Sequence, residues 1–433
     1  MRKQIKSYDD DDRDESSDRV RTRAEARERR TRAREFGKKH SGTLADSTVE
    51  QALRADQRVA MWLASPLDHS SGAALLRLLS LPTLERMAVM PDVHPSADVC
   101  VGTVLATSSL VFPQAIGGDI GCGMSAVRLA VTSDAFAEDQ RHEILSSMSR
   151  HIDTIMSRGE HKRARRVAAL PDPERLSEPH LRSLARRDGA AQLGTLGRGN
   201  HFVELQCDEH GEHWLMVHSG SRLMGQHVAG FFTRIAQQSG TRAALVGLDT
   251  NTDAGQSYMI CQDWCVDYAR QNRLALLEAA TTAISRITPV RACWDDLIDV
   301  PHNLVRPELH DGRPLVVHRK GAAPASSGQL GVIPGSAGTF SVHVEGRGEA
   351  RSLASSSHGA GRIYSRRDAK DRISTRDLAT QMRGVTFDED LSGSLRSEAP
   401  GAYRDLRDVL RAQSDLVRVV RTLKPLVSFK AGG

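Results

Sequence analysis

Aromatic side chains and long apolar runs are both scarce in this sequence. Phe, Trp and Tyr make up only 4% of its 433 residues, so a core must rest on Leu, Val, Ile and Ala. No stretch approaches the roughly 20 apolar residues of a membrane helix, and the opening residues 1–4 are not followed by the apolar run of a secretory signal. These absences argue against a membrane or secreted protein and predict a cytoplasmic one.

Cysteine is sparse as well, with six residues in the chain. A long chain in a reducing compartment rarely uses so few thiols as a disulfide framework, so we expect a metal-ligand role for one of them instead. Charge of one sign is not in large excess, because 59 Lys and Arg stand against 54 Asp and Glu, for a net charge of +5. This modest excess favours a nucleic-acid partner only weakly.

Residues 1–40 differ in composition from the rest of the chain. An acidic tract at 9–12 is followed by an Arg- and Glu-rich stretch over 19–39 that has almost no large apolar side chains. Such a segment cannot bury a face, so we expect a disordered or frayed helical arm; an RNA-contacting arm is the alternative. No internal repeat of 20 to 50 residues is apparent, and residues 41–433 are expected to form one continuous domain.

Hydrophobic periodicity predicts an α+β fold, a single large domain with mixed β-sheets flanked by helices. Helices are expected at 51–64, 73–79, 135–150 and 258–283, and strands at 87–90, 103–107, 126–130, 214–218, 315–318 and 340–344. A last helix is expected over 402–423, stopped by Pro425, before a short strand at 426–430 that carries Lys430. The polar, Arg-rich region 153–187 is expected at the surface.

The most informative stretch is 115–124, where Asp119 and Cys122 stand among four glycines. Glycines let the backbone turn sharply and bring an acid and a thiol to one point, as a metal ion requires. A buried Cys in such a turn is more often packing alone. Three further candidates, His201, His218 and His302, lie in polar or small-residue loops; with the acid and a bridging thiolate they could hold two divalent ions. Their convergence is a hypothesis, since a lone histidine is usually a surface or core residue.

A fourth histidine, His358, lies in the run 355–362, which is otherwise Ser, Gly, Ala and Arg. Small residues let the main chain approach phosphate oxygens, and a histidine presented there can act as a nucleophile toward phosphorus. The alternative is a flexible connector. The loops at 319–322 and 334–339 resemble anion cradles by the same reasoning, although each is equally consistent with a solvated turn.

Taken in order, these segments resemble the RtcB family of RNA-splicing ligases, from about Val89 to the C-terminus. The matching segments are 90–94, 117–124, 194–204, 218–225, 301–303, 319–322, 334–339, 358–362 and 412–426. The resemblance implies that Asp119, Cys122, His201, His218 and His302 bind two Mn²⁺ ions, with Cys122 bridging, and that His358 is guanylylated. It assigns a GTP- and GMP-binding role to Asn200, Phe202, Glu204, Pro334, Gly335, Ser336, Ser341, His358, Gly359, Ala360, Gly361 and Lys430. It gives Arg222, Lys320 and Arg366 to RNA phosphates, and Asp92 to a supporting position near the metals.

By the same resemblance, the expected reaction joins an RNA 3′-phosphate or 2′,3′-cyclic phosphate end to a 5′-hydroxyl end, in tRNA splicing or RNA repair. GMP passes from the histidine to the 3′-phosphate and is expelled when the 5′-hydroxyl attacks. The implied partners are GTP, Mn²⁺ and RNA with those ends, and the sequence leaves open whether an archease-like activator is needed.

The sequence departs from the family in several loops. After His94-Pro95 the usual Gly-Lys-Gly is replaced by Ser96-Ala97-Asp98, which removes a cation and adds an acid. Leu223, Ala337 and the segment 322–325 also differ from the usual residues. Three hypotheses therefore remain: an active ligase, a weakened paralogue that binds RNA ends, and a structural metal protein. Retention of His358 and Lys430 favours the first.

Overall fold

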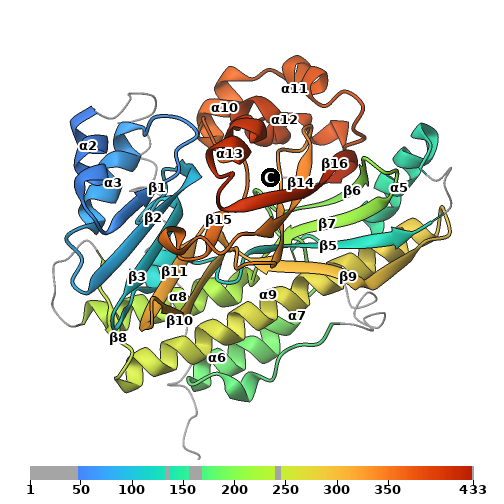
Figure 1. Cartoon of the computed structure of the whole chain (residues 1–433). Helices are drawn as coiled ribbons and strands as arrows, with labels where there is room; N and C mark the ends of the chain where they lie inside the picture. The colour runs from blue at the N-terminus through green and yellow to red at the C-terminus, as the bar shows by residue number, and fades with distance from the viewer. Residues whose placement is uncertain (1–46, 132–135, 156–167, 239–244, 432–433) are drawn as a thin grey trace, which may run out of the picture.

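The computed structural model describes residues 47–131, 136–155, 168–238 and 245–431. The expected arm over 1–40 lies outside these described residues. The α+β class is confirmed, since two large sheets share the molecule with helices that cover them (Figure 1).

The first sheet has five strands in the order β1-β2-β3-β11-β10. Their bounds are β1 (Val59–Met61), β2 (Leu84–His94), β3 (Val101–Thr107), β11 (Arg313–Lys320) and β10 (Asn303–His310). Only β1 runs parallel to its neighbour; the other pairs are antiparallel. The strands expected at 87–90, 103–107 and 315–318 are confirmed here. α2 (Ser47–Ala55) and α3 (His69–Leu78) lie beside this sheet in Figure 1.

The second sheet has seven antiparallel strands in the order β13-β14-β16-β6-β7-β5-β9. Their bounds are β13 (Leu330–Ile333), β14 (Ser341–Gly346), β16 (Val417–Phe429), β6 (Phe202–Asp208), β7 (His213–Ser219), β5 (Gly123–Ala130) and β9 (Arg291–Pro301). The strands expected at 126–130 and 214–218 are confirmed, and the one expected at 340–344 begins one residue later. Two short pairs complete the sheets: β4 (Leu110–Val111) with β8 (Leu248–Asp249), and β12 (Ala322–Pro324) with β15 (Ser355–Ser357).

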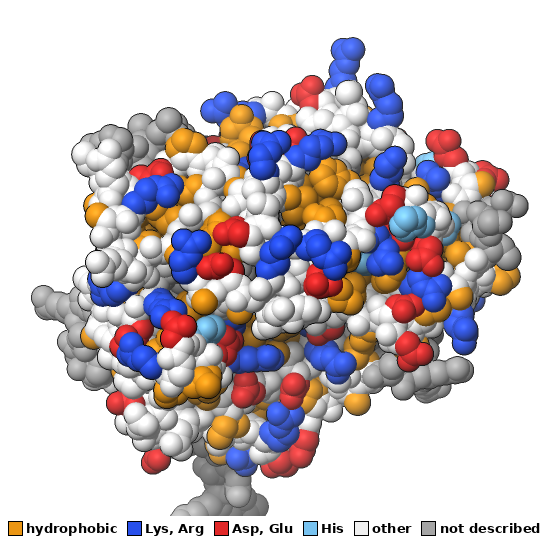
Figure 2. Space-filling view, in the orientation of Figure 1, with side chains coloured by type: hydrophobic (Ala, Val, Ile, Leu, Met, Phe, Trp, Pro, Cys, Tyr) orange, Lys and Arg blue, Asp and Glu red, His pale blue; other side chains and the backbone are white. Residues whose placement is uncertain are grey.

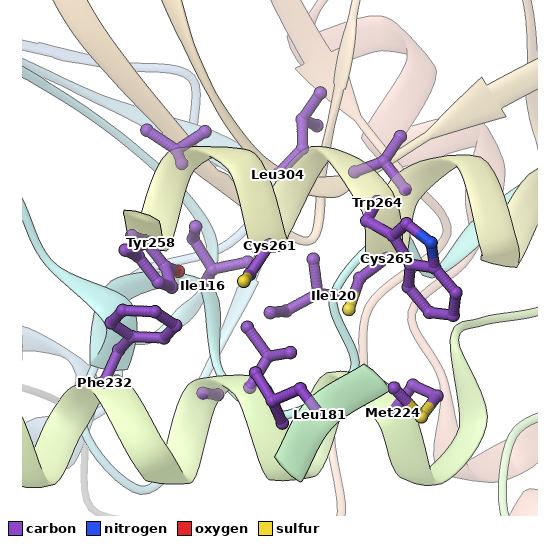
Figure 3. Packing of buried hydrophobic residues seen from close by; sticks show 14 of the residues in the cluster. Ile116, Ile120, Leu181, Met224, Phe232, Tyr258, Cys261, Trp264, Cys265 and Leu304 are labelled. Carbon is purple, nitrogen blue, oxygen red and sulfur yellow. The ribbon is translucent and has the colours of Figure 1, made fainter. Parts of the chain in front are cut away.

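A long helix, α9 (Asp253–Ser285), runs along one face of the seven-stranded sheet (Figure 1). It confirms the helix expected at 258–283, and the side chain of Thr252 caps its N-terminus by accepting from the Gly255 amide. α5 (Glu138–His151) and α8 (Arg222–Gln237) pack against it. Figure 3 shows the core between α8 and α9, in which Tyr258, Trp264 and Phe232 are fully buried. None of the helices in the described segments is long and apolar enough to span a bilayer.

Three sequence expectations are wrong. The region 153–187 is not wholly surface, because Leu176, Leu181 and Ala185 are fully buried in the same hydrophobic cluster as α8 and α9 residues; Leu181 is labelled in Figure 3. These three apolar residues are spaced four to five positions apart among charged ones, so the average composition concealed them.

The helix expected over 402–423 is also wrong. α13 (Leu406–Ala412) is followed by β16, which begins at Val417. The run Val417 to Thr422 is rich in β-branched residues, which favour strands, and β16 lies between β14 and β6. Pro425 is accommodated at a register shift between β16 and β6. Similarly, the helix expected at 51–64 ends at Ala55, where the chain turns toward β1.

Small helices fill the remaining connections. They are α4 (Pro113–Ile116), α6 (Pro179–Leu184), α7 (Ala190–Gln192), α10 (Arg366–Arg372), α11 (Thr375–Gln381), α12 (Ser392–Leu395), a π-helical turn at Ala185–Gly189, and 3₁₀ turns at Pro173–Arg175, Ala350–Ser352, Glu389–Leu391, Arg396–Glu398 and Pro400–Ala402. α10 to α13 gather at the top of Figure 1.

Candidate active site

Four of the expected metal ligands lie at one end of four neighbouring strands. Cys122 directly precedes β5, His201 directly precedes β6, His218 is near the end of β7, and His302 directly follows β9. These strands are consecutive in the sheet and antiparallel, so the starts of β5 and β6 meet the ends of β7 and β9 at the same edge. The backbone fixes this edge further, since the His302 amide donates to the Cys122 carbonyl over 2.7 Å.

The turn that carries Asp119 and Cys122 is anchored in the core. Ile120, between them, is fully buried in the cluster of Figure 3, which contributes about 2 kcal/mol of burial free energy. Gly121 has a φ of +73°, and a Cβ there would approach the Cα of Val266 on α9 to 2.8 Å. Glycine is therefore required for the turn to pack this closely against the helix.

The side chains of Cys122, His201 and His218 converge. The Cys122 Sγ lies 3.2 Å from His218 Nε2 and 3.6 Å from His201 Nε2, and all three groups are buried. His302 extends the group, because its Nε2 is 3.2 Å from that of His218. Asp119 Oδ2 lies 3.0 Å from His201 Nε2. All five side chains predicted as metal ligands are thus brought together.

The donor atoms of this group suit a cation. His201 Nδ1 and His218 Nδ1 lie 3.0 and 3.1 Å from the carbonyl oxygens of Leu196 and Asn200, which only accept hydrogen bonds. Each ring therefore donates through Nδ1, which leaves Nε2 as the nitrogen that faces Cys122. Burial lowers the pKa of His218 and His302 well below the ordinary range, and it raises the pKa of the Cys122 thiol well above its own. A thiolate at this point requires a positive charge beside it.

His358 lies next to this group, directly after β15. Its Nδ1 is 2.6 Å from Oδ2 of Asp92, which also accepts from the His358 backbone amide over 3.2 Å. The Asp92 carboxylate is completely buried in β2, whereas 15% of the His358 side chain is exposed. The ring of His358 is 4.7 Å from that of His302, centre to centre. The carboxylate fixes the ring so that Nε2 is its free nitrogen.

A cavity of about 1220 Å³ opens on these residues. Every residue predicted to bind GTP or GMP lines it: Asn200, Phe202, Glu204, Pro334, Gly335, Ser336, Ser341, His358, Gly359, Ala360, Gly361 and Lys430. Phe202 packs on the His218 ring at 5.7 Å, and Lys430 Nζ lies 5.3 Å from the centre of the Phe202 ring. Burial raises the pKa of Glu204 to about 8 and lowers that of Lys430.

Of the three residues predicted to receive RNA phosphates, Lys320 and Arg366 line the cavity and Arg222 does not. The Arg222 Nε donates to the Thr195 hydroxyl over 3.1 Å, so its guanidinium supports the loop before His201. In the altered loop, Ser96 lines the cavity. Burial lowers the pKa of Lys320, and the charge of the exposed Asp98 partly opposes that shift.

An ionic cluster that sequence reasoning missed forms another side of the cavity. Glu398, only 5% exposed, accepts from Arg362 Nη1 over 3.2 Å and from Arg366 Nε over 2.8 Å, and it also bonds the Tyr403 hydroxyl. Burial opposes the charge of Glu398, but Lys430 and the two arginines outweigh it and lower its pKa to about 2. His94, Asn303 and Arg404 also line the cavity without having been assigned a role. The Pro-Asp-Val-His and Pro-His-Asn motifs pointed to the first two; no local signal pointed to Glu398 or Arg404.

On the face shown in Figure 2, Lys and Arg side chains lie among Asp and Glu side chains. This mixture of charges agrees with the small net charge, which by itself favours a nucleic-acid partner only weakly.

Comparison with known proteins decides the family. The family model described as "tRNA-splicing ligase RtcB" matches residues 74–431, most of the chain. The chain belongs to the RtcB family. It is 34% identical over 404 residues to the RNA-splicing ligase RtcB of Escherichia coli (strain K12), covering 86% of this chain and 97% of that protein. The RtcB proteins of Mycobacterium tuberculosis (29% identical over 437 residues; 82% of this chain and 99% of the relative) and Methanococcus maripaludis (27% over 424 residues; 80% and 88%) are also similar.

Family membership confirms the resemblance seen in the sequence. The RtcB proteins named above are ligases, and the described part of this chain keeps a thiol, three imidazoles and a carboxylate in contact beside His358. The substitutions at 96–98 leave these contacts intact.

Proposed function

We propose that this RtcB-family chain is an RNA ligase that joins 3′-phosphate or 2′,3′-cyclic phosphate ends to 5′-hydroxyl ends, using GTP and Mn²⁺, in tRNA splicing or RNA repair. One observation carries the proposal: His358, held by Asp92, lies beside the cysteine–histidine group in a single cavity. We assign the activity to residues 41–433 and place it in the cytoplasm, where a free Cys122 stays reduced.

His358 is the proposed nucleophile. Its Nδ1 is held by Asp92, so Nε2 carries the lone pair that attacks the α-phosphorus of GTP. The new N–P bond forms as the bond from that phosphorus to the bridging oxygen breaks, and pyrophosphate leaves with the electron pair. Asp92 stabilises the positive charge that develops on the ring. GMP is then transferred to the RNA 3′-phosphate, which becomes an activated end.

Asp119, Cys122, His201, His218 and His302 are the residues that would hold two Mn²⁺ ions, with Cys122 as the thiolate ligand. Borderline divalent ions accept this mixture of sulfur, nitrogen and oxygen donors. When bound, the ions neutralise phosphate charge and orient the reacting groups. The protein contributes the fixed directions of the His201 and His218 lone pairs, through the carbonyls of Leu196 and Asn200.

The remaining cavity residues bind the nucleotide and the RNA. Phe202 offers a ring face, Glu204 and Lys430 offer buried polar groups, and the loop at Pro334 to Ser336 offers small residues that let phosphates approach the main chain. Lys320 and Arg366 are the proposed contacts to RNA phosphates. Arg222 is a further proposed contact to RNA phosphate; it lies outside the cavity lining, where its guanidinium donates to the Thr195 hydroxyl.

A ligation assay tests this proposal. The purified chain is incubated with GTP, Mn²⁺ and two RNA oligonucleotides, one ending in a 3′-phosphate and one in a 5′-hydroxyl, and joined product is measured on a denaturing gel. Product is expected with 3′-phosphate and cyclic phosphate ends and not with a 3′-hydroxyl end. A parallel reaction supplies an archease-like protein. Retention of labelled RNA without any joining in either reaction would favour the weakened, RNA-binding paralogue.

A further inference from the structure

One side of the cavity contains none of the proposed metal, nucleotide or RNA-phosphate ligands. It is lined by residues around the start of α3 and around the end of β2: Ser65, Pro66, Asp68, Ser70, His94, Pro95 and Ser96. His94 brings this side close to the chemistry, because its ring stacks on that of His358 at 6.5 Å, centre to centre. A substrate group bound here would therefore lie next to the nucleophile.

The hydrogen bonds of His94 fix which nitrogen is free. Its Nδ1 lies 2.8 Å from the backbone carbonyl oxygen of Asp92, which only accepts, so Nδ1 carries the hydrogen and donates. Burial lowers the pKa of His94 to about 4, and the ring is neutral at physiological pH. The Nε2 atom is then a hydrogen-bond acceptor, and it has no partner within the described part of the chain.

Two other acceptors on this side, the Asp68 carboxylate and the Ser65 hydroxyl, are already engaged. The carboxylate of Asp68 accepts from the Ser70 hydroxyl over 2.5 Å and from the Ser71 amide and hydroxyl over 2.9 and 2.6 Å. The Ser65 hydroxyl accepts from Arg404 Nε over 3.1 Å. The guanidinium of Arg404 also donates to the carbonyls of Val93 and Arg362, so it ties the two loops together. His94 Nε2 is left as an open acceptor beside His358.

The two RNA ends that a ligase joins differ in chemistry. A phosphate end needs cations and donors, which the residues around Arg366 and Lys430 provide. A 5′-hydroxyl end carries no charge at its terminus and has one hydrogen to donate, so its orientation requires an acceptor. His94 Nε2 offers such an acceptor directly beside His358.

We propose that His94 Nε2 accepts a hydrogen bond from the RNA 5′-hydroxyl and orients its oxygen for attack; this inference rests on the proposed ligase function. In that step the 5′-oxygen forms a bond to the phosphorus of the activated 3′ end. The bond from this phosphorus to the oxygen of GMP breaks, GMP leaves with the electron pair, and the hydroxyl proton passes to solvent. His94 acts in this joining step, after His358 has given up its nucleotide.

Two substitutions at His94 distinguish the role of Nδ1 from the role of Nε2. In His94→Asn an amide N–H remains near the position of Nδ1 and keeps the bond to the Asp92 carbonyl, but nothing replaces Nε2. In His94→Gln the longer side chain places a carbonyl acceptor near the position of Nε2 and gives up the bond to Asp92. An acceptor role predicts that Gln is the better replacement, whereas a role in holding Asp92 and His358 predicts Asn.

The assay uses RNA whose 3′-phosphate already carries GMP, so that joining to a 5′-hydroxyl RNA is measured without the earlier steps. We expect His94→Asn to slow joining by about tenfold or more and His94→Gln to stay within about threefold of wild type. Labelling of His358 by GTP, measured in parallel, should be retained in His94→Asn. Thermal unfolding of each variant shows that it is folded.

Three results would overturn the inference. His94→Asn joining at the wild-type rate would exclude an acceptor role. His94→Gln joining more slowly than His94→Asn, or a loss of His358 labelling in His94→Asn equal to the loss of joining, would make His94 a support for Asp92 only. Failure of the proposed function looks different, because the wild-type chain would then neither take label from GTP nor join activated RNA.

Discussion

The cysteine–histidine side of the cavity (Cys122, His201, His218 and His302) and the arginine side (Arg362, Arg366, Glu398 and Lys430) stabilise their polar groups by opposite means. On the first, burial keeps the His218 and His302 imidazoles and the Cys122 thiol neutral, and their donor atoms face one another. On the second, one buried carboxylate holds several cations through ion pairs. The first side is built to receive a cation, and the second keeps excess positive charge for an anion.

The largest expected effect comes from removing the thiol of the cysteine–histidine side. In Cys122→Ala we expect Mn²⁺ binding and nucleotide transfer to His358 both to be abolished, because no other sulfur lies among these donors in the described chain. Metal content after dialysis and labelling by GTP measure the two effects. Cys207→Ala is the matched control, since that thiol lies elsewhere, near the Asp208 carbonyl. Unchanged metal content in Cys122→Ala would remove Cys122 from the ligand set.

The next effect concerns the residue that holds the nucleophile. Asp92→Asn keeps the size of the side chain but removes the charge that stabilises the His358 ring, and it can place an amide N–H against the donors of His358. We expect labelling of His358 to slow on the order of 100-fold or more, with Mn²⁺ binding unchanged. Single-turnover labelling measures the rate. A normal rate would mean that the 2.6 Å contact is only structural.

The pH dependence of the free energy of unfolding tests the ion pairs of the arginine side. The pKa of Glu398 lies near 2, below its ordinary value of 4.5, so its charge stabilises the fold above pH 4.5 and this contribution is lost as the pH falls toward 2. Glu398→Gln should lower the free energy of unfolding on the order of 3 kcal/mol at pH 7, and by little near pH 2. Chemical unfolding across this range measures both. Glu143→Gln, at an exposed position, is the control, and a difference that does not change with pH would contradict the account.

The smallest effect comes from the altered loop. Asp98 opposes the effect of burial on Lys320, a proposed contact to RNA phosphate. Asp98→Lys should lower the KM for RNA by about threefold at low salt, and the gain should disappear as salt screens the charge. Asp139→Lys makes the same charge change on α5 and serves as the control. Equal gains in both variants would point to net charge rather than to the loop.

Sequence reasoning reached the cysteine–histidine side and, on the arginine side, Arg366 and Lys430, but it missed Glu398 for a physical reason. The residues of the first lie in glycine-rich turns and strand ends whose local pattern suggests metal or phosphate chemistry. Glu398 and Arg404 lie in short helices and turns without such a pattern, and their roles depend on partners that only the fold brings near.

The same limit explains the error at the C-terminus. The apolar spacing over 402–423 fits a helix, and the strand β16 is selected by pairing with β6 and β14, which lie far away in the sequence. The α+β class, the long helix α9 and most strands followed from local periodicity, because their burial patterns are decided within the segment.

The most direct test of the central claim is incubation of the chain with GTP labelled at the α-phosphate in the presence of Mn²⁺, followed by mapping of the label. The account predicts covalent label on the peptide that contains His358, and none in His358→Ala that has kept its Mn²⁺ and its fold. Label that persists in His358→Ala, or a wild-type chain that binds Mn²⁺ but takes no label, would contradict it.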